Sequence, residues 1–122
     1  MSEDPRVLVV DDDEGIRDLV AVVLADQGYE VSVAEHGAAA LDLLRKERPA
    51  AILLDMRMPV MDGWAFAAAY RQLPAPHAPI IVLTAARDAA QRAAEIGADA
   101  ALGKPFTVAE LAACVAQYAR PP

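Results

Sequence analysis

The sequence predicts an α/β fold in which five parallel strands alternate with five helices, a doubly wound three-layer sandwich with strand order 2-1-3-4-5. Short aliphatic runs alternate along the chain with segments whose apolar residues recur at helical spacing. Several of these runs contain no polar residue, which is typical of strands covered by helices on both faces. No linker or low-complexity tract divides the 122 residues. We therefore expect one domain over residues 1–122, with its core over residues 6–119.

Three strands and two helices are predicted in the first half of the chain. The strands are expected at residues 6–10, 30–34 and 51–54. The second strand alternates apolar and polar residues, so we place it at an edge of the sheet. Apolar residues at three- and four-residue spacing predict a helix over 14–27, which Gly28 ends, and another over 37–47, which Pro49 follows.

The second half supplies the last two strands, at residues 79–83 and 99–102, and three helices. The helices are expected at 64–72, at 87–96 and after Thr107. Thr107 and Glu110 have the spacing of a capping box, in which each side chain bonds the backbone N–H of the other at a helix start.

Composition restricts the classes of partner. The chain has 11 basic and 18 acidic residues, a formal net charge of −7, which argues against nonspecific binding to nucleic acid or to an anionic membrane. Cys114 is the only cysteine, so it cannot form an internal disulfide, and we expect it to pack as a small apolar group. Because the chain starts without a signal peptide and no apolar run could span a bilayer, we expect a soluble protein in the reducing cytoplasm.

Polar residues stand at the ends of four predicted strands. Asp11 and Asp12 follow the first, Asp55 the third, Thr84 the fourth and Lys104 the fifth. A single aspartate after a strand is ordinarily a helix cap or a turn residue. In the order 2-1-3-4-5, however, Asp12 and Asp55 lie on neighbouring strands about 4.8 Å apart. Lys104 lies two strands from Asp55, about 10 Å along the sheet, a gap that its stem and an added phosphoryl group could close.

Three carboxylates at one edge of a sheet repel one another, since two unit charges about 4 Å apart cost around 4 kcal/mol at an effective dielectric constant near 20. Such a cluster needs either raised pKa values or a bound cation. Oxygen ligands suit a hard divalent ion, Mg²⁺ above all, with Mn²⁺ as a second candidate. The Thr84 hydroxyl and the Lys104 ammonium group suit the oxygens of an anion. Together these groups are equipped for phosphoryl transfer to a nucleophilic carboxylate.

Four motifs occur in order along the chain. They are Asp11-Asp12 after Val-Leu-Val-Val, Asp55 with Met58-Pro59 and Met61-Asp62-Gly63 behind it, Thr84-Ala85 after Ile-Ile-Val-Leu, and Lys104-Pro105-Phe106. In these motifs and their intervals the chain resembles, over essentially its full length, the receiver domain of two-component response regulators, of the CheY-like superfamily. The resemblance implies a single receiver domain with a flavodoxin-like fold.

The resemblance also implies a role for each site residue. Asp55 would accept a phosphoryl group from a phosphohistidine on a sensor histidine kinase or a histidine phosphotransfer protein. Asp12, Asp55 and the main-chain carbonyl of Arg57 would bind Mg²⁺ directly, and Asp11 would bind it through water. Thr84 would turn towards the phosphoryl group and Lys104 would pair with it. The Lys104-Pro105 peptide is a candidate cis bond, as in that family.

Three positions depart from the pattern of that family. Ala101 stands three residues before Lys104, where receivers usually carry Tyr or Phe, so an aromatic ring cannot swing inward there. The interval from Thr84 to Gly97 is about two residues short, which predicts a trimmed fourth helix. Arg57 and Ala86 flank the site at positions that tune the lifetime of the phosphoryl group in the family. The phosphorylation chemistry is therefore expected to be intact, while the route of its readout is open.

Other polar and aromatic residues have simpler interpretations. Asp13 and Glu14 favour the positive end of a helix dipole, and Asp62-Gly63 favours a loop and a helix cap. His36 and His77 lie away from the strand ends, so we expect them at the surface. Side chains expected to pack are Trp64, Phe66, Tyr70, Met56, Met58 and Met61.

The leading hypothesis is a switch that catalyses its own phosphorylation and dephosphorylation and binds partners differently in its two states, rather than an enzyme. An aspartyl phosphatase would need an aspartate pair like Asp11 and Asp13, but no insertion is large enough to hold its substrate. A degenerate docking or dimerisation module is a third hypothesis, against which the complete set of site residues argues. The chain stops at Arg120-Pro-Pro, just after the last expected helix, and we favour a stand-alone receiver slightly over one cut from a longer regulator, for which a Pro-Pro end could be the start of a linker. The output partner and a phosphorylation-dependent dimer stay open.

Overall fold

The structure is a computed structural model, and it describes residues 5–119. Within that range the strands form one parallel sheet in the order β2-β1-β3-β4-β5, which confirms the predicted topology. The strands are β1 (Arg6–Val10), β2 (Glu30–Ala34), β3 (Ala51–Asp55), β4 (Ile80–Ala85) and β5 (Ala100–Lys104). The expectations about the first four residues and about Arg120-Pro-Pro lie outside the described residues.

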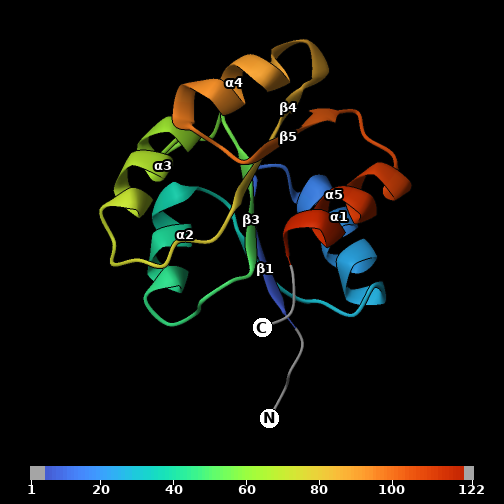
Figure 1. Cartoon of the computed structure of the whole chain (residues 1–122), viewed down its shortest axis with the longest axis horizontal. Helices are drawn as coiled ribbons and strands as arrows, with labels where there is room; N and C mark the ends of the chain where they lie inside the picture. The colour runs from blue at the N-terminus through green and yellow to red at the C-terminus, as the bar shows by residue number, and fades with distance from the viewer. Residues whose placement is uncertain (1–4, 120–122) are drawn as a thin grey trace.

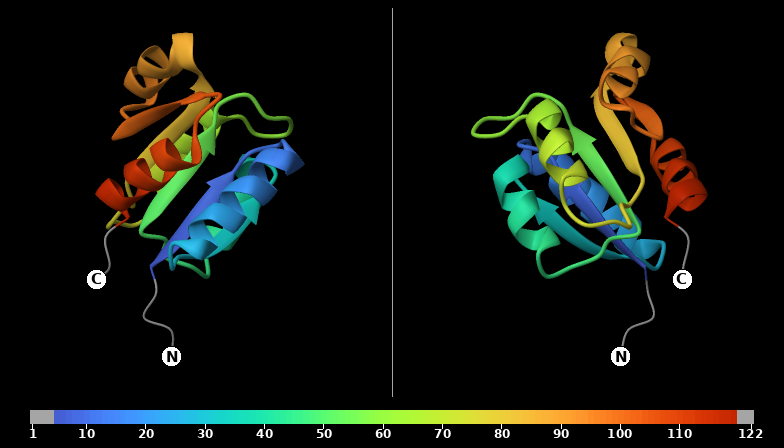
Figure 2. Two further views of the ribbon diagram at one scale, coloured as in Figure 1. Left: turned by 90° about the vertical axis from the view of Figure 1, so that its right-hand side faces the viewer. Right: turned by 60° about the vertical axis from the view of Figure 1, so that its left-hand side comes forward.

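Helices alternate with the strands and cover both faces of the sheet. They are α1 (Glu14–Asp26), α2 (Gly37–Leu44), α3 (Gly63–Arg71), α4 (Ala89–Ile96) and α5 (Val108–Tyr118), with a 3₁₀ turn, η1 (Ala86–Asp88), directly before α4. In Figure 1 the helices α2, α3 and α4 lie on one side of the sheet, and α1 and α5 lie on the other. The turned views of Figure 2 show α1 and α5 in front of the sheet on the left, and α2 and α3 in front of it on the right.

The alternation of side chains along the strands creates two apolar cores, one on each face of the sheet. The first contains β-strand residues packed with α1 and α5, among them Val7, Val9, Leu53, Leu83, Val20, Leu24, Leu111 and Val115. The second contains β-strand residues packed with α2, α3 and the residues around them, among them Leu8, Val10, Ile52, Leu54, Met56, Phe66 and Tyr70. Burial on both faces explains why the central strands need continuous aliphatic runs.

The aromatic residues and methionines pack as the sequence predicts. Phe66 and Tyr70 are buried, and their rings stack with centroids 5.9 Å apart. Met56 is fully buried, while Met58, Met61 and Trp64 lie against the second core. Cys114 is half-buried against the first core, where burial raises the pKa of its thiol. It therefore packs as the small apolar group that was expected.

Side chains that accept a backbone hydrogen bond begin four of the helices. Asp13 caps α1 and Asp62 caps α3, as predicted, and Thr107 and Glu110 form the predicted capping box of α5. The fourth cap refines an expectation, because His36 was expected at the surface and is half-buried. Its Nδ1 accepts a hydrogen bond of 3.1 Å from the N–H of Ala39 at the start of α2. His77 is exposed, as expected.

Three boundaries differ from the prediction. α2 ends at Leu44 and not at residue 47, because the N–H groups of Lys46 and Glu47 both turn back to the carbonyl of Leu43. The predicted helix over 87–96 is divided into η1 and α4, which begins at Ala89. The fourth strand continues past residue 83 to Ala85.

The fifth strand is also shifted, since it runs over residues 100–104 and not 99–102. Asp99 stays outside the strand, where its carboxylate accepts a hydrogen bond of 2.9 Å from the N–H of Ile80. At the other end, Gly103 and Lys104 pair with Thr84 and Ala85 of β4. Lys104 is therefore the last residue of the strand, which fixes its backbone at the edge of the sheet where the site lies.

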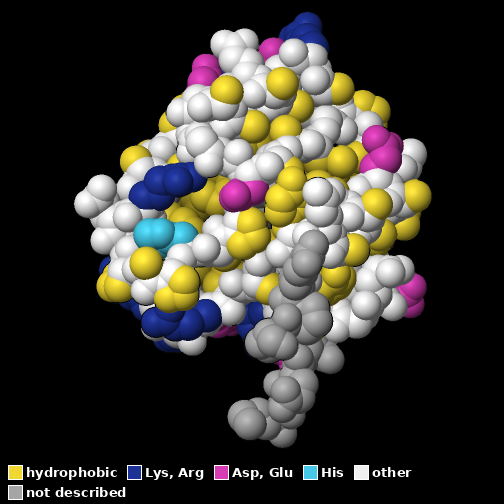
Figure 3. Space-filling view, viewed as in Figure 1, with side chains coloured by type: hydrophobic (Ala, Val, Ile, Leu, Met, Phe, Trp, Pro, Cys, Tyr) yellow, Lys and Arg dark blue, Asp and Glu magenta, His cyan; other side chains and the backbone are white. Residues whose placement is uncertain are grey.

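On the face seen in Figure 3, the acidic side chains do not form a continuous patch. Acidic and basic side chains are scattered there among hydrophobic and uncharged ones. Among residues 5–119, no helix is both long enough and apolar enough to cross a membrane.

Gly103 allows η1 to lie directly on β5. A Cβ atom at residue 103 would come within 2.6 Å of the Ala86 Cα and 2.7 Å of its Cβ. Real Cβ atoms do not approach backbone that closely, so the strand and the 3₁₀ turn can meet only because the strand has a glycine at this position.

We expect Gly103→Ala to destabilise the protein by about 1–3 kcal/mol, because η1 must move away from β5. The free energy of unfolding would be measured by urea denaturation, with Gly15→Ala as the control, since Gly15 is exposed in α1. The control should change the free energy of unfolding by no more than about 1 kcal/mol, because a Cβ at residue 15 would meet only the Asp13 Oδ1 atom, at 3.2 Å. Equal stability of Gly103→Ala and the unsubstituted protein would show that η1 does not need this close approach.

Candidate functional site

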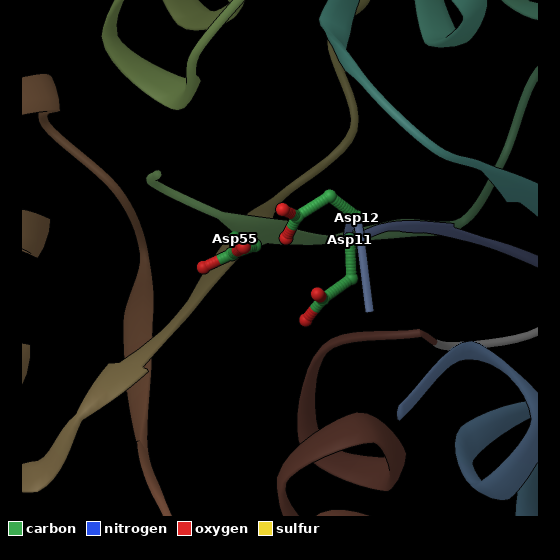
Figure 4. Close-up of side chains that lie close together, drawn as sticks. All are labelled: Asp11, Asp12 and Asp55. Carbon is green, nitrogen blue, oxygen red and sulfur yellow. The ribbon is translucent and has the colours of Figure 1, made fainter. Parts of the chain in front are cut away.

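Three carboxylates meet at the carboxyl ends of the central strands. Asp11 and Asp12 directly follow β1, and Asp55 is the last residue of β3. Each offers one oxygen atom to a group whose members all lie within 4.8 Å of one another. Figure 4 shows the three side chains converging from the two strands. The predicted approach of Asp12 to Asp55 is confirmed.

Lys104 reaches this cluster from the end of β5. Its Nζ lies 2.9 Å from Asp11 Oδ2 and 3.6 Å from Asp55 Oδ1. The expected gap of two strands is thus closed by the lysine stem alone, without an added phosphoryl group. Burial disfavours the charged form of Lys104, but the hydrogen bond and the charge of Asp11 outweigh burial and raise its pKa. Lys104 therefore stays protonated between two carboxylates.

Asp11 is fixed by three contacts and is fully buried. One carboxylate oxygen accepts from Lys104 and the other accepts a hydrogen bond of 2.9 Å from the N–H of Asp13. Its main-chain carbonyl accepts a hydrogen bond of 2.8 Å from Arg17 Nη1. Arg17 was not predicted at the site, because its only signal in the sequence is its position one turn into the helix that follows the acidic run. Because both carboxylate oxygens of Asp11 are engaged within the protein, Asp12 and Asp55 are the more accessible ligands.

Asp55 is the carboxylate whose ionisation the protein disturbs most. The residue is only 7% exposed. Burial is the main reason that its pKa is raised from 3.8 to about 7, and the negative charge of Asp11 adds to the effect. The attraction of Lys104 lowers the pKa, while a hydrogen bond with Asp12 and the charge of Asp12 raise it. Near neutral pH, Asp55 therefore holds a proton about half of the time unless further positive charge is present.

The donor set fits a divalent cation. Asp12 is exposed and the Asp55 side chain keeps 10% of its surface exposed, so both can offer hard carboxylate oxygens of the kind that Mg²⁺ prefers. A cation would also relieve the repulsion that raises the pKa of Asp55. The buried carboxylate of Asp11 adds to the negative charge at this site. Arg57 is exposed in the loop after Asp55.

Thr84 stands beside Asp55 in the sheet. Asp55 pairs with Leu83 of β4, and Thr84 is the next residue along that strand. Thr84 is 9% exposed. Among residues 5–119 its hydroxyl has no hydrogen-bond partner. A largely buried hydroxyl that is free to donate a hydrogen bond suits an anion bound at Asp55.

The loop after Asp55 is held in place by close backbone contacts. The N–H of Met61 donates to the carbonyl of Pro59 at 2.7 Å, and Val60 between them has φ 67°. This γ-turn places a β-branched residue in the left-handed region, which is strained. The carbonyl of Met61 accepts from the N–H of Gly37, which ties the loop to the start of α2. The loop beside Asp55 therefore has a defined shape.

The departures in the fifth strand and fourth helix are visible in the structure. Ala101 is half-buried against the second core, and Ala93, Ile96 and Ala98 pack against the same core. α4 has eight residues, in agreement with the expected trimming. The Lys104–Pro105 peptide is cis, as expected, and Ala75–Pro76 is a second cis bond that was not predicted.

Comparison of the sequence with known protein families agrees with the fold and the site described above. The sequence profile of the response regulator receiver domain matches residues 7–116. The chain belongs to the receiver domain family of response regulators. Receiver domains of two-component systems are signalling switches, and the fold described above is that of this family.

Curated relatives give the same assignment. The chain is 42% identical over 110 residues to the response regulator MprA of Mycolicibacterium vanbaalenii, and 41% identical over 110 residues to MprA of Mycobacterium avium (strain 104). The matches cover 88% of this chain but 47% and 48% of the relatives. The receiver domain thus spans about half the length of the curated relatives that it matches.

Solved structures agree in fold. The chemotaxis response regulator CheY4 of Vibrio cholerae superposes with a TM-score of 0.86 at 35% identity, over 94% of this chain and 98% of that one. The signal receiver domain of a signal transduction histidine kinase from Syntrophus aciditrophicus superposes with a TM-score of 0.83 at 30% identity, over 93% and 89% of the two chains.

The raised pKa of Asp55 predicts an unusual pH dependence of stability. An acid whose pKa is higher in the folded state stabilises the fold below its unfolded pKa and loses that contribution as the pH rises through the folded pKa. In chelator, the free energy of unfolding of the unsubstituted receiver, relative to Asp55→Asn, should therefore fall between pH 4 and 7.5 by up to about 4 kcal/mol. Urea denaturation of both proteins across this range measures the difference.

Mg²⁺ provides the control for that experiment. Because a cation replaces the missing positive charge, millimolar Mg²⁺ should reduce the fall for the unsubstituted receiver and have little effect on Asp55→Asn. A difference between the two proteins that stays constant with pH in chelator would contradict the raised pKa.

Proposed function

We propose that this receiver domain accepts a phosphoryl group on Asp55, in a reaction that depends on Mg²⁺, and that phosphorylation changes which partners it binds. One observation carries the proposal. Asp55 is a poorly hydrated carboxylate that lies among two further carboxylates, a lysine and a hydroxyl without a hydrogen-bond partner among residues 5–119. This set contains a nucleophile, ligands for a cation and two groups suited to phosphoryl oxygens.

The donor is proposed to be a phosphohistidine of a sensor histidine kinase or of a histidine phosphotransfer protein. A carboxylate oxygen of Asp55 attacks the phosphorus, so that a P–O bond forms and the P–N bond to the imidazole breaks. The donor imidazole leaves with the bonding electron pair and takes up a proton. Attack by water on the aspartyl phosphate later releases inorganic phosphate and restores the Asp55 carboxylate. Both steps require positioning and charge neutralisation more than proton transfer.

Asp12, Asp55 and the main-chain carbonyl of Arg57 are proposed to hold the Mg²⁺ ion, with Asp11 acting through water. The engagement of both Asp11 oxygens by Lys104 and Asp13 supports this division. Mn²⁺ is a substitute with the same preference for oxygen ligands. When bound, the cation supplies the positive charge that keeps the carboxylates ionised and that balances the phosphoryl oxygens.

Lys104 and Thr84 are proposed to respond to the phosphoryl group. The group would add negative charge next to the Lys104 ammonium, which already lies 3.6 Å from Asp55 Oδ1. Lys104 would exchange part of its contact with Asp11 for the phosphoryl oxygens. Thr84 would donate its hydroxyl to the same group, which draws the end of β4 towards Asp55. These two movements would convert a local charge change into a second conformation.

Intact mass spectrometry tests the proposal directly. We expect incubation with acetyl phosphate and Mg²⁺ to add one phosphoryl group to the unsubstituted receiver and none to Asp55→Asn. Chelator should prevent the addition, because the carboxylates then repel both one another and the donor. The Asp55→Asn protein is the matched control, since the substitution is nearly isosteric and removes only the nucleophile and its charge.

Two results would decide against the proposal. Mg²⁺-dependent labelling of Asp55→Asn would place the phosphoryl group on another residue. If neither acetyl phosphate nor a phosphorylated histidine protein modified the unsubstituted receiver, the chain would act as a docking module without phosphorylation.

Lys104→Met separates phosphoryl transfer from its consequence. The substitution keeps much of the stem and removes the charge, so we expect an aspartyl phosphate still to form, more slowly. The change in proteolytic susceptibility or amide exchange that accompanies phosphorylation should be much smaller than in the unsubstituted receiver. A variant with normal labelling and an undiminished conformational response would show that Lys104 does not transmit the change.

A further inference from the structure

A polar cluster joins α3 to α4, the helix that is shorter than the family pattern. It consists of Trp64 on α3 and of Arg92 and Glu95 on α4. The indole Nε1 of Trp64 donates to Glu95 Oε1 at 3.0 Å, and Arg92 Nη1 lies 2.8 Å from both oxygens of the same carboxylate. The guanidinium group of Arg92 also lies over the Trp64 ring, 5.4 Å from its centroid. Each of the three side chains therefore contacts the other two.

A second contact holds the end of α4 to the end of α3. Arg71 Nη2 donates to the carbonyls of Ile96 at 2.9 Å and Gly97 at 3.0 Å. These carbonyls stand at the C-terminus of α4, where a positive charge is favourable. Because α4 is short, the Trp64 cluster and the Arg71 contact hold its last turns to α3.

The two helices that meet in this cluster both start from the phosphoacceptor site. At the start of α3, a Cβ on Gly63 would lie 2.8 Å from the carbonyl oxygen of Asp55, so Gly63 touches the Asp55 backbone, and Trp64 is the next residue. On the other path, Ala85 and η1 alone separate Thr84 from α4. A movement of Thr84 relative to Asp55 therefore reaches both sides of the Trp64 cluster through short, packed connections.

Because β5 has small residues, this receiver cannot pass on a change at Thr84 through a moving aromatic ring, as receivers usually do. Ala101 provides no ring that could change position. Gly103 lets η1 pack directly on the backbone of β5, so a movement of Thr84 passes to α4 through closely packed contacts. The contacts between α3 and α4 are made by side chains at the surface, which can separate without a change in the sheet.

We infer that the Trp64–Arg92–Glu95 cluster is a latch that holds α4 against α3 in the unphosphorylated receiver and opens when Asp55 is phosphorylated. The inference rests on the proposed function. When Thr84 moves towards the phosphoryl group, it draws η1 and α4 with it, while Gly63 holds the start of α3 to the Asp55 backbone. Opening of the latch would expose the indole ring of Trp64 and widen the groove between α3 and α4, which Trp64 lines together with Ala68 and Glu95.

The latch has a reciprocal consequence for phosphorylation. A contact that is present only in the unphosphorylated state opposes the phosphorylated one, and the coupling acts equally in both directions. Removing the latch should therefore favour the phosphorylated state, even though the cluster does not contact Asp55.

Fluorescence of Trp64, which is the only tryptophan, tests the inference. The unsubstituted receiver, Arg92→Met and Glu95→Gln would be measured before and after phosphorylation by acetyl phosphate with Mg²⁺, with intact mass recorded on the same samples. Asp42→Asn is the matched control, because Asp42 and Arg45 are also an acid–base pair three residues apart, on α2.

In the unsubstituted receiver and the control, we expect phosphorylation to shift the emission to longer wavelength and to increase quenching by acrylamide. In Arg92→Met and Glu95→Gln, the emission should already be shifted and should change little on phosphorylation. The steady-state phosphorylated fraction of these two variants should exceed that of the unsubstituted receiver and of Asp42→Asn.

Three outcomes are distinguishable. A phosphorylated receiver with unchanged Trp64 emission would overturn the latch and leave the proposed function standing. An equal response in Arg92→Met, Glu95→Gln and the control would overturn it as well. Absence of a phosphoryl adduct with acetyl phosphate and with a phosphorylated histidine protein would overturn the proposed function, and the latch with it.

Discussion

The contact of Lys104 with Asp11 and Asp55 is the interaction on which the site depends. It sets one positive charge against two poorly hydrated carboxylates, at 2.9 and 3.6 Å. Without it, the carboxyl ends of β1 and β3 would place uncompensated charges side by side in a region of low dielectric constant, which is strongly destabilising. With it, the three ionised carboxylates Asp11, Asp12 and Asp55 still exceed the lysine by two negative charges. Lys104 therefore neutralises enough of the charge for the protein to fold, and the negative charge that remains can attract a cation.

The sheet order makes this contact possible. Parallel strands end at the same edge, and the order β2-β1-β3-β4-β5 sets the aspartates of β1 and β3 next to each other at its centre. The two apolar cores fix the strands from both sides, so the side chains at their ends inherit a rigid base. Such a base suits phosphoryl transfer, in which positioning supplies most of the catalysis. The loops at this edge are correspondingly well tied, through Gly37 to Met61 and through Gly63 to Met56.

The sequence predicts those features that depend on the backbone pattern. Uninterrupted aliphatic runs identify the strands, and the strand order then brings Asp11, Asp12 and Asp55 together. Features that depend on side-chain reach are not predictable in the same way. The length of the Lys104 stem decides whether it meets Asp11, and a local hydrogen bond decides that His36 caps α2. The Trp64–Glu95 contact joins residues 31 apart in sequence, so only the packing of α3 against α4 reveals it.

The replacement of an aromatic residue by Ala101 has a consequence for how any signal leaves the pocket. A relay through a moving ring needs both the ring and a space for it to enter, and the close approach of Gly103 to Ala86 fills the region beside β5. Displacement at Thr84 must then be absorbed by α4 as a body. A helix of eight residues has little internal stability, so its position is set by its contacts with α3 and the sheet. Under the proposed latch, the strength of the α3–α4 contact would govern output from this receiver, and substitutions there should alter signalling without altering the chemistry proposed at Asp55.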